Sequence, residues 1–114
     1  MNSTERGRLA EVAARGYLEM RGFEIIEQNW RRPRAEIDVI AKKDGVVHFV
    51  EVKFRASNDQ GSGLDAITAT KLKQMQRAAW LWVDESKWHG EYVLSAVEIG
   101  SPNYAVLSFV EDVF

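Results

Sequence analysis

Residues 35–55 have the sequence AEIDVIAKKDGVVHFVEVKFR, which predicts two β-strands joined by a tight turn. The dipeptide Asp44-Gly45 in the middle of this stretch is a favoured two-residue hairpin turn, and apolar residues dominate on both sides of it. A turn at these two residues fixes the register, because the numbers of paired residues must then add up to 89. We therefore expect Asp38 to lie opposite Glu51 on the neighbouring strand.

This register separates polar from apolar side chains. Side chains alternate between the two faces of a strand, and a slip of one residue would move each of them to the other face. One face is predicted to join the core through Ile37, Val39, Val50 and Val52. The other face is predicted to carry Glu36, Asp38, Glu51 and Lys53.

The opposed carboxylates of Asp38 and Glu51 are costly without compensation. Directly opposed residues on antiparallel strands have Cβ atoms about 4.5–5.5 Å apart, and like charges at that spacing destabilise a sheet. A divalent cation would offset the repulsion, and hard oxygen ligands suit Mg²⁺ or Mn²⁺. Lys53, two residues after Glu51 on the same face, would orient or deprotonate a water molecule or stabilise charge on a phosphate. The arrangement indicates metal-assisted hydrolysis of a phosphodiester.

A simpler interpretation of the same residues stays open. The spacing Glu-x-Lys is common in proteins, and Glu36 and Lys53 would also make a plain cross-strand ion pair on a solvated face. The pattern of these residues alone does not decide between a solvated face and a catalytic site.

Outside this hairpin the chain shows the periodicities of further helices and strands. The remaining predicted elements are helices over 5–21 and 64–84, strands over 23–30, 91–99 and 104–110, and a polar loop over 57–63. The resulting order is α-β-β-β-α-β-β, which is typical of a mixed α/β domain with helices packed on a central sheet. A length of 114 residues predicts a single domain over 1–114.

Positive charge is concentrated in the middle of the chain. The whole chain has a formal net charge of −2, whereas residues 29–77 carry +4 and residues 78–114 carry −5. Local potential steers a polyanion more than net charge does, so the middle segment is a candidate nucleic-acid surface, with a solvated polar surface as the alternative. The candidate contacts are Arg31, Arg32, Arg34, Arg55, Lys71, Lys73 and Arg77. Trp30 is the tryptophan expected to contact nucleic acid, and the other three are expected in the core.

Several classes of protein are excluded by composition. The chain has no cysteine, which removes disulfides, thiolate zinc sites and cysteine nucleophiles. The first residues lack the apolar stretch of a secretory signal, and no apolar run approaches the roughly 20 residues of a membrane helix. We expect a cytoplasmic protein that does not bind membranes.

Several motifs together resemble a known family. The matching stretches are GRLAE at 7–11, Asn29-Trp30, EIDVIA at 36–41, FVEVKFR at 49–55, and the single residues Gly61 and Lys71. In these the chain resembles the YraN family of predicted endonucleases, which is similar to archaeal Holliday junction resolvases and belongs to the PD-(D/E)XK nuclease superfamily. One departure is Leu94-Ser95-Ala96, which stands where family members often have Arg-Phe-Asp.

The resemblance implies a restriction-endonuclease-like fold and a role for each site residue. It implies that Asp38 and Glu51 bind Mg²⁺ or Mn²⁺ together with the backbone carbonyl of Val52, that Lys53 is the catalytic lysine, and that Glu11 projects from the first helix toward the same site. DNA is expected as substrate rather than RNA, with branched or repair intermediates as candidates. By analogy with resolvases, a homodimer is also expected.

The sequence leaves three candidate functions. The leading hypothesis is a metal-dependent DNA endonuclease. The second is a nucleic-acid-binding module without turnover, acting as a subunit of a DNA-processing complex. The third is a protein-interaction domain that uses the acidic residues of 78–114.

Overall fold

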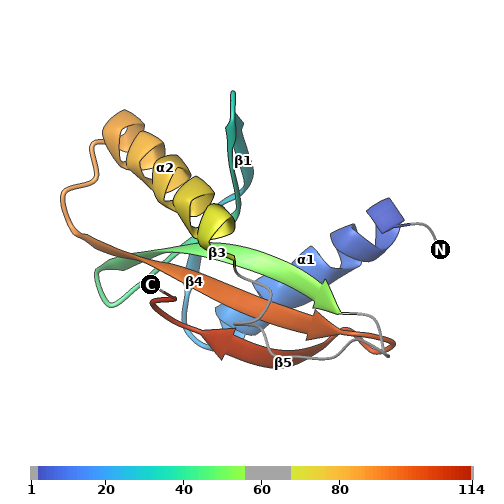
Figure 1. Cartoon of the computed structure of the whole chain (residues 1–114). Coiled ribbons are helices and arrows are strands. Elements are labelled where there is room, and N and C mark those ends of the chain that lie inside the picture. The colour runs from blue at the N-terminus through green and yellow to red at the C-terminus, as the bar shows by residue number, and fades with distance from the viewer. Residues whose placement is uncertain (1–2, 56–67, 114) are drawn as a thin grey trace.

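A computed structural model describes residues 3–55 and 68–113 of the chain. Two helices and five strands follow one another in the predicted order (Figure 1). Their bounds are α1 Ser3–Met20, β1 Glu24–Arg32, β2 Ala35–Lys43, β3 Val46–Arg55, α2 Ala69–Ser86, β4 Glu91–Gly100 and β5 Ala105–Val110. The predicted loop over 57–63 and the first residues of the predicted second helix lie outside the described residues.

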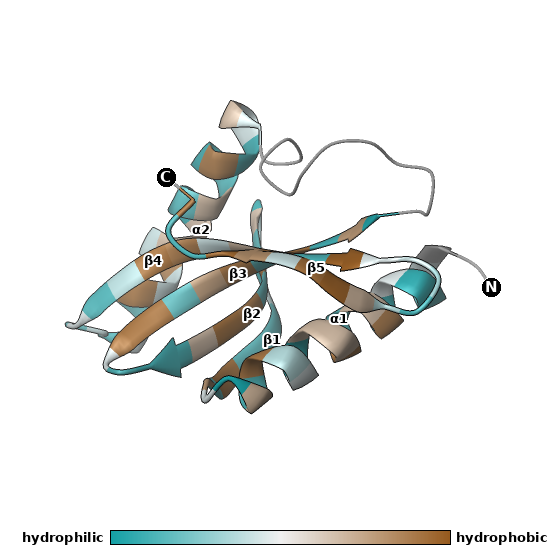
Figure 2. Ribbon diagram, turned by 90° about the horizontal axis from the view of Figure 1, so that it is seen from below, coloured by the Kyte–Doolittle hydropathy of each residue, from teal (hydrophilic) through white to brown (hydrophobic). Residues whose placement is uncertain are grey.

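The five strands form one sheet in the order β1-β2-β3-β4-β5. Neighbouring strands are antiparallel except β3 and β4, which are parallel over their whole length and are connected through α2. Apolar and polar residues alternate along much of β3 (Figure 2). The structure is thus a mixed α/β fold, as the sequence predicted.

The β2–β3 hairpin has the predicted register over part of its length. Asp44 and Gly45 both have positive φ, at 53° and 78°, as a two-residue hairpin turn requires. Pairing runs from Lys43 opposite Val46 to Val39 opposite Val50, and the paired residue numbers add up to 89 throughout. Beyond Val39 and Val50 the two strands are no longer paired, whereas β3 continues alongside β4. A gap therefore opens between β2 and β3 where Asp38 and Glu51 lie.

Helix α1 covers one face of the sheet. Its residues Ala10, Ala14 and Leu18 are fully buried and pack against an apolar cluster that includes Val39 and Val50. The helix ends at Met20, and Gly22 follows with a φ of 91°, the left-handed conformation that glycine adopts easily. Backbone bonds from Gly22 to Glu19 and from Phe23 to Leu18 close a Schellman motif, which directs the chain into β1.

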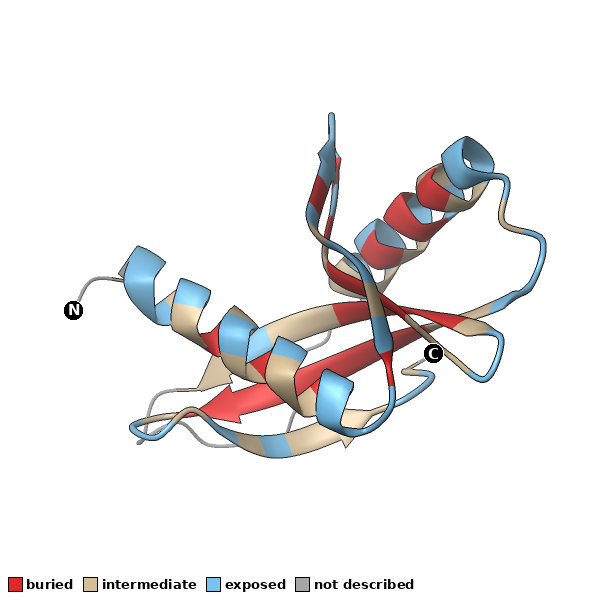
Figure 3. Cartoon of the chain, turned by 180° about the vertical axis from the view of Figure 1, so that it is seen from behind, coloured by how far each residue is buried: buried red, intermediate tan, exposed pale blue. Residues whose placement is uncertain are grey.

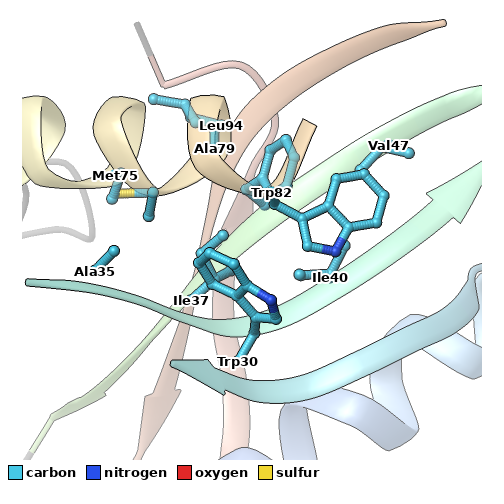
Figure 4. Packing of buried hydrophobic residues seen from close by; sticks show 11 residues of the cluster. Trp30, Ala35, Ile37, Ile40, Val47, Met75, Ala79, Trp82 and Leu94 are labelled. Atoms are coloured by element: carbon cyan, nitrogen blue, oxygen red, sulfur yellow. The ribbon is translucent and has the colours of Figure 1, made fainter. Parts of the chain in front are cut away.

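Helix α2 covers the opposite face, and Thr68 caps its N-terminus by accepting a hydrogen bond from the Lys71 backbone N–H. Trp82 packs beside Ile40 (Figure 4). Its ring also contacts the ring of Phe49. Both faces of the sheet are therefore buried around the hairpin (Figure 3).

The prediction that Ile37 lies on the same face of the sheet as Val39 is wrong. Ile37 packs with Trp30 in the cluster under α2, whereas Val39 and Val50 pack under α1. The pairing of β1 with β2 omits Asn29 and Asp38, and Asn29 has a φ of 51°. A left-handed residue interrupts the alternation of side chains. The end of β1 and the start of β2 therefore turn toward α2 (Figures 1 and 3).

Among the described residues, no helix is long and apolar enough to cross a membrane.

Candidate functional site

The gap between β2 and β3 holds the two carboxylates that the sequence singled out. Asp38 comes from β2 and Glu51 from β3, each one residue beyond the last pair of the ladder. The Asp38 Oδ2 atom accepts a hydrogen bond of 2.8 Å from the Val52 backbone N–H. The Asp38 side chain thus satisfies an amide that has lost its partner strand, and this bond fixes the carboxylate inside the gap.

The pKa of Asp38 is raised from 3.8 to about 7, mainly by burial. The nearby charge of Glu51 and close contact with the Glu51 side chain also contribute to this rise, while the Val52 N–H acts in the opposite direction. The Asp38 and Glu51 carboxyl groups are therefore held together at an electrostatic cost, which a bound proton or a cation would reduce.

The Val52 carbonyl also faces this gap. In an extended strand the N–H and C=O of one residue point to the same side, and the Val52 N–H points to Asp38. The predicted ligand set of Asp38, Glu51 and the Val52 carbonyl is thus directed into one space. All three groups supply oxygen, the donor that Mg²⁺ and Mn²⁺ prefer.

Glu11 approaches the site from the other face of the sheet. It lies on α1 between the buried residues Ala10 and Ala14, and its charge contributes to the raised pKa of Asp38. Within residues 3–55 and 68–113, however, no three histidine, aspartate or glutamate side chains come close enough together to hold a metal ion. Glu11 is therefore near Asp38 without completing a cluster of three carboxylates.

Two lysines flank Glu51. Lys53 is exposed and makes no ion pair with any described residue. Lys71, in the first turn of α2, places its Nζ atom 2.9 Å from Glu51 Oε2, with both side chains largely buried. Burial alone would lower the pKa of Lys71, but its hydrogen bond to Glu51 and the charges of Glu51, Asp38 and Glu36 raise it above the ordinary value. Lys71 was predicted from the sequence as a nucleic-acid contact, and its ion pair with Glu51 was not predicted.

A second ion pair lies further along β3. Arg55 Nε is 2.5 Å from Glu98 Oε2, and both side chains are largely buried. Ser108 also donates a hydrogen bond of 3.4 Å to Glu98. Arg55, a predicted nucleic-acid contact, is thus bound within the sheet. Ala96 is aligned with Glu51 in β4, so the altered late-strand stretch lies next to the site and brings no charge to it.

A groove with a volume of about 410 Å³ opens beside the gap. It runs between the β1–β2 turn and the start of α2. Its lining residues are Arg31, Arg32, Arg34, Ala35, Glu36, Lys71, Gln74 and Met75. Four of the seven predicted nucleic-acid contacts are therefore gathered in one groove, next to the carboxylates.

The predicted basic residues are not equally available. Arg32 makes a bidentate ion pair with Glu85, and Arg31 lies 3.6 Å from Glu36. Arg34 is exposed and makes no ion pair with a described residue. Lys73 and Arg77 are exposed on α2 outside the groove lining. Of the seven residues, four therefore line the groove, Arg55 is in a buried ion pair, and Lys73 and Arg77 lie on the exposed side of α2.

The tryptophan predicted to contact nucleic acid is buried. Trp30 is only 4% exposed and packs in the apolar cluster under α2 (Figure 4). The Arg32 guanidinium lies over its ring. Trp80, which was expected in the core, is 61% exposed. Both predictions are wrong, because the left-handed Asn29 turns Trp30 inward and Trp80 points away from the buried stripe of α2.

Comparison with known proteins identifies relatives over most of the chain. A UPF0102 protein of Sulfurihydrogenibium sp. (strain YO3AOP1) is 36% identical over 91 residues, which cover 80% of this chain and 79% of the relative. A UPF0102 protein of Photobacterium profundum is 34% identical over 109 residues, covering 93% and 87%. One from Shewanella frigidimarina is 42% identical over 87 residues, covering 76% and 78%.

The family match includes the gap and the groove. Residues 10–105 match the family described as uncharacterised protein family UPF0102, and this range contains Glu11, Asp38, Glu51 and Lys71. The chain therefore belongs to the UPF0102 family.

Proposed function

We propose that this protein is an Mg²⁺- or Mn²⁺-dependent endonuclease that hydrolyses phosphodiester bonds in DNA. The observation that supports this most is the pair of Asp38 and Glu51 carboxylates in the gap, where the pKa of Asp38 is raised to about 7. A carboxyl group perturbed by burial and by a neighbouring acid is a common feature of catalytic sites.

The donor set fits the proposed metal. Asp38, Glu51 and the Val52 carbonyl would hold the cation, and the Val52 N–H already fixes one oxygen of Asp38. When bound, such a cation polarises a phosphoryl oxygen and lowers the pKa of a water molecule. A nuclease of the restriction-endonuclease-like class is consistent with the five-stranded sheet and with the motifs that resemble the YraN family.

The remaining side chains have matching tasks. The exposed Lys53 ammonium, on the strand that carries Glu51, would orient or deprotonate the attacking water or neutralise charge on the phosphate. Arg31 and Arg34 line the adjacent groove, where they would bind the phosphate backbone and position the strand. Branched or repair intermediates of DNA are the proposed substrates, with a homodimer as the proposed assembly.

Cleavage assays on isosteric variants test this proposal. Asp38→Asn and Glu51→Gln should each abolish Mn²⁺-dependent cleavage across a panel of branched, nicked and linear DNA while the folded circular-dichroism spectrum is retained. Glu24→Gln is a matched control, because Glu24 loses the same charge on an exposed site and pairs only loosely with Lys42, at 4.0 Å. Full activity of either site variant, in a preparation free of contaminating nuclease, would exclude the proposed site.

A binding module without turnover is the second candidate. The observation in its favour is that the Lys71 ammonium already neutralises Glu51, so the carboxylates have a counter-ion that is part of the chain. This candidate predicts DNA binding that weakens with salt and is equal in EDTA and in Mg²⁺, with no cleaved product. Binding that strengthens with Mg²⁺ would favour the nuclease.

A further inference from the structure

Lys71 stands at the boundary between the two parts of the site. Its Nζ atom contacts Glu51 Oε2 at 2.9 Å, and the same side chain lines the groove that holds Arg31 and Arg34. The Lys71 side chain is 30% exposed, compared with 16% for Glu51, so it is the more accessible partner of the pair. The lysine ammonium is a compact charge on a flexible four-carbon stem, so it can reach either Glu51 or the groove.

Glu51 and an anion bound in the groove would compete for the Lys71 ammonium. Glu51 attracts it when no other cation is present, since the gap contains two carboxylates. A divalent cation bound through Glu51 would repel an ammonium that stays in contact with the same carboxylate. An anion in the groove would attract it, as it would the arginines there.

We propose that Lys71 is an exchangeable counter-ion that couples the groove to the carboxylates. In the free protein it neutralises Glu51. When a divalent cation occupies the gap, Lys71 turns to a phosphate in the groove. Metal and phosphate backbone therefore each favour the binding of the other, and the coupling is reciprocal. This inference rests on the proposed function, because it requires a metal at Glu51.

Calorimetric titration of Mn²⁺ in metal-free buffer, without DNA, tests the first half. In Lys71→Met the apolar stem is kept and the competing charge is gone, so the Kd for Mn²⁺ should fall by about tenfold relative to wild type. Lys73→Met is the matched control: Lys73 is exposed on the same helix and loses the same charge, and its Kd should stay within about threefold of wild type. Lys71→Gln serves as a second variant if Lys71→Met does not fold.

Dimethyl phosphate, a phosphodiester anion with nothing to cleave, tests the second half. When it replaces chloride at equal ionic strength, Mn²⁺ affinity should rise in wild type and in Lys73→Met, and should not change in Lys71→Met.

The outcomes separate the inference from the proposed function. If wild type binds Mn²⁺ and Lys71→Met binds it no more tightly than Lys73→Met does, the metal site stands and the counter-ion exchange is refuted. An equal effect of dimethyl phosphate on all three proteins refutes the coupling. If none of the proteins binds Mn²⁺, with or without dimethyl phosphate, the metal site itself is refuted and the inference with it.

Discussion

Asp38→Asn should make the protein more stable at neutral and alkaline pH, although it removes a residue of the proposed catalytic site. Burial and the charge of Glu51 disfavour the ionised Asp38 carboxylate. Asparagine is neutral, has nearly the same shape, and keeps an oxygen that can accept the hydrogen bond from the Val52 N–H. The variant thus removes the electrostatic cost and keeps the structural contact.

The sign and size of the effect follow from the pKa of Asp38. Its pKa is about 7 in the folded chain, against an ordinary value of 3.8. Between these values the folded state still binds a proton that the unfolded state has lost, so the free energy of unfolding falls as pH rises. At about 1.4 kcal/mol for each pKa unit, the loss approaches roughly 4 kcal/mol above pH 7. We expect Asp38→Asn to recover about 2–4 kcal/mol of the free energy of unfolding, because asparagine carries no charge at any pH.

Urea denaturation with EDTA present, followed by tryptophan fluorescence, measures this difference. The free energy of unfolding of the variant should equal that of wild type near pH 4 and be higher at about pH 8. The difference at pH 8 corresponds to roughly 10 °C in melting temperature. Glu24→Gln, at an exposed carboxylate, should show no such pH dependence.

Two results would refute the reasoning. A variant that is less stable than wild type at about pH 8 would mean that the ionised carboxylate stabilises the fold. A stability difference that is the same at both pH values would mean that it does not arise from ionisation.

Further predictions concern the buried pair, the tryptophans and the groove. Glu98→Ala removes the carboxylate from a largely buried ion pair and should cost about 3 kcal/mol, whereas Glu85→Ala, at a more exposed pair, should cost less than about 1 kcal/mol; equal losses in urea denaturation would contradict the assigned burial. Trp30→Ala should destabilise by about 3–5 kcal/mol, and Trp80→Ser by no more than about 0.5 kcal/mol, in the same assay. Arg34→Ala should weaken DNA binding and lower the slope of log affinity against log salt by about 1, measured by fluorescence anisotropy; an unchanged slope would place the phosphate contacts elsewhere.

The hairpin could be predicted because its information is local. Asp44-Gly45 determines the turn, and the turn determines the register, so the pairing of Val39 with Val50 follows from the sequence alone. The juxtaposition of Asp38 and Glu51 also follows, since both lie one residue further out. The element order could be predicted for the same reason, because each helix and strand shows its own periodicity.

The gap could not be predicted in this way. It depends on where α2 packs and on the left-handed conformation of Asn29, and both are set by contacts distant in sequence. Hydrophobic alternation assigned Ile37 to the face of Val39, but packing against Trp30 and α2 reverses that side.

Two features of α2 follow from helical geometry. At 100° per residue, Lys71 lies on the same stripe as Met75 and Trp82, so a lysine pointing at the sheet could have been found. The same geometry places Trp80 about 200° from Trp82, on the outer side of the helix.

The gap between β2 and β3 also has a consequence for hydrogen exchange. The Val52 amide is protected by a carboxylate and not by the carbonyl of a neighbouring strand, so its exchange with solvent is governed by the rotation of one side chain. A side chain can turn away without any strand separating. The Val52 amide proton should therefore exchange through local fluctuation of Asp38. Hydrogen-bonded amides in the ladder from Val39 to Lys43 should exchange only when β2 and β3 separate.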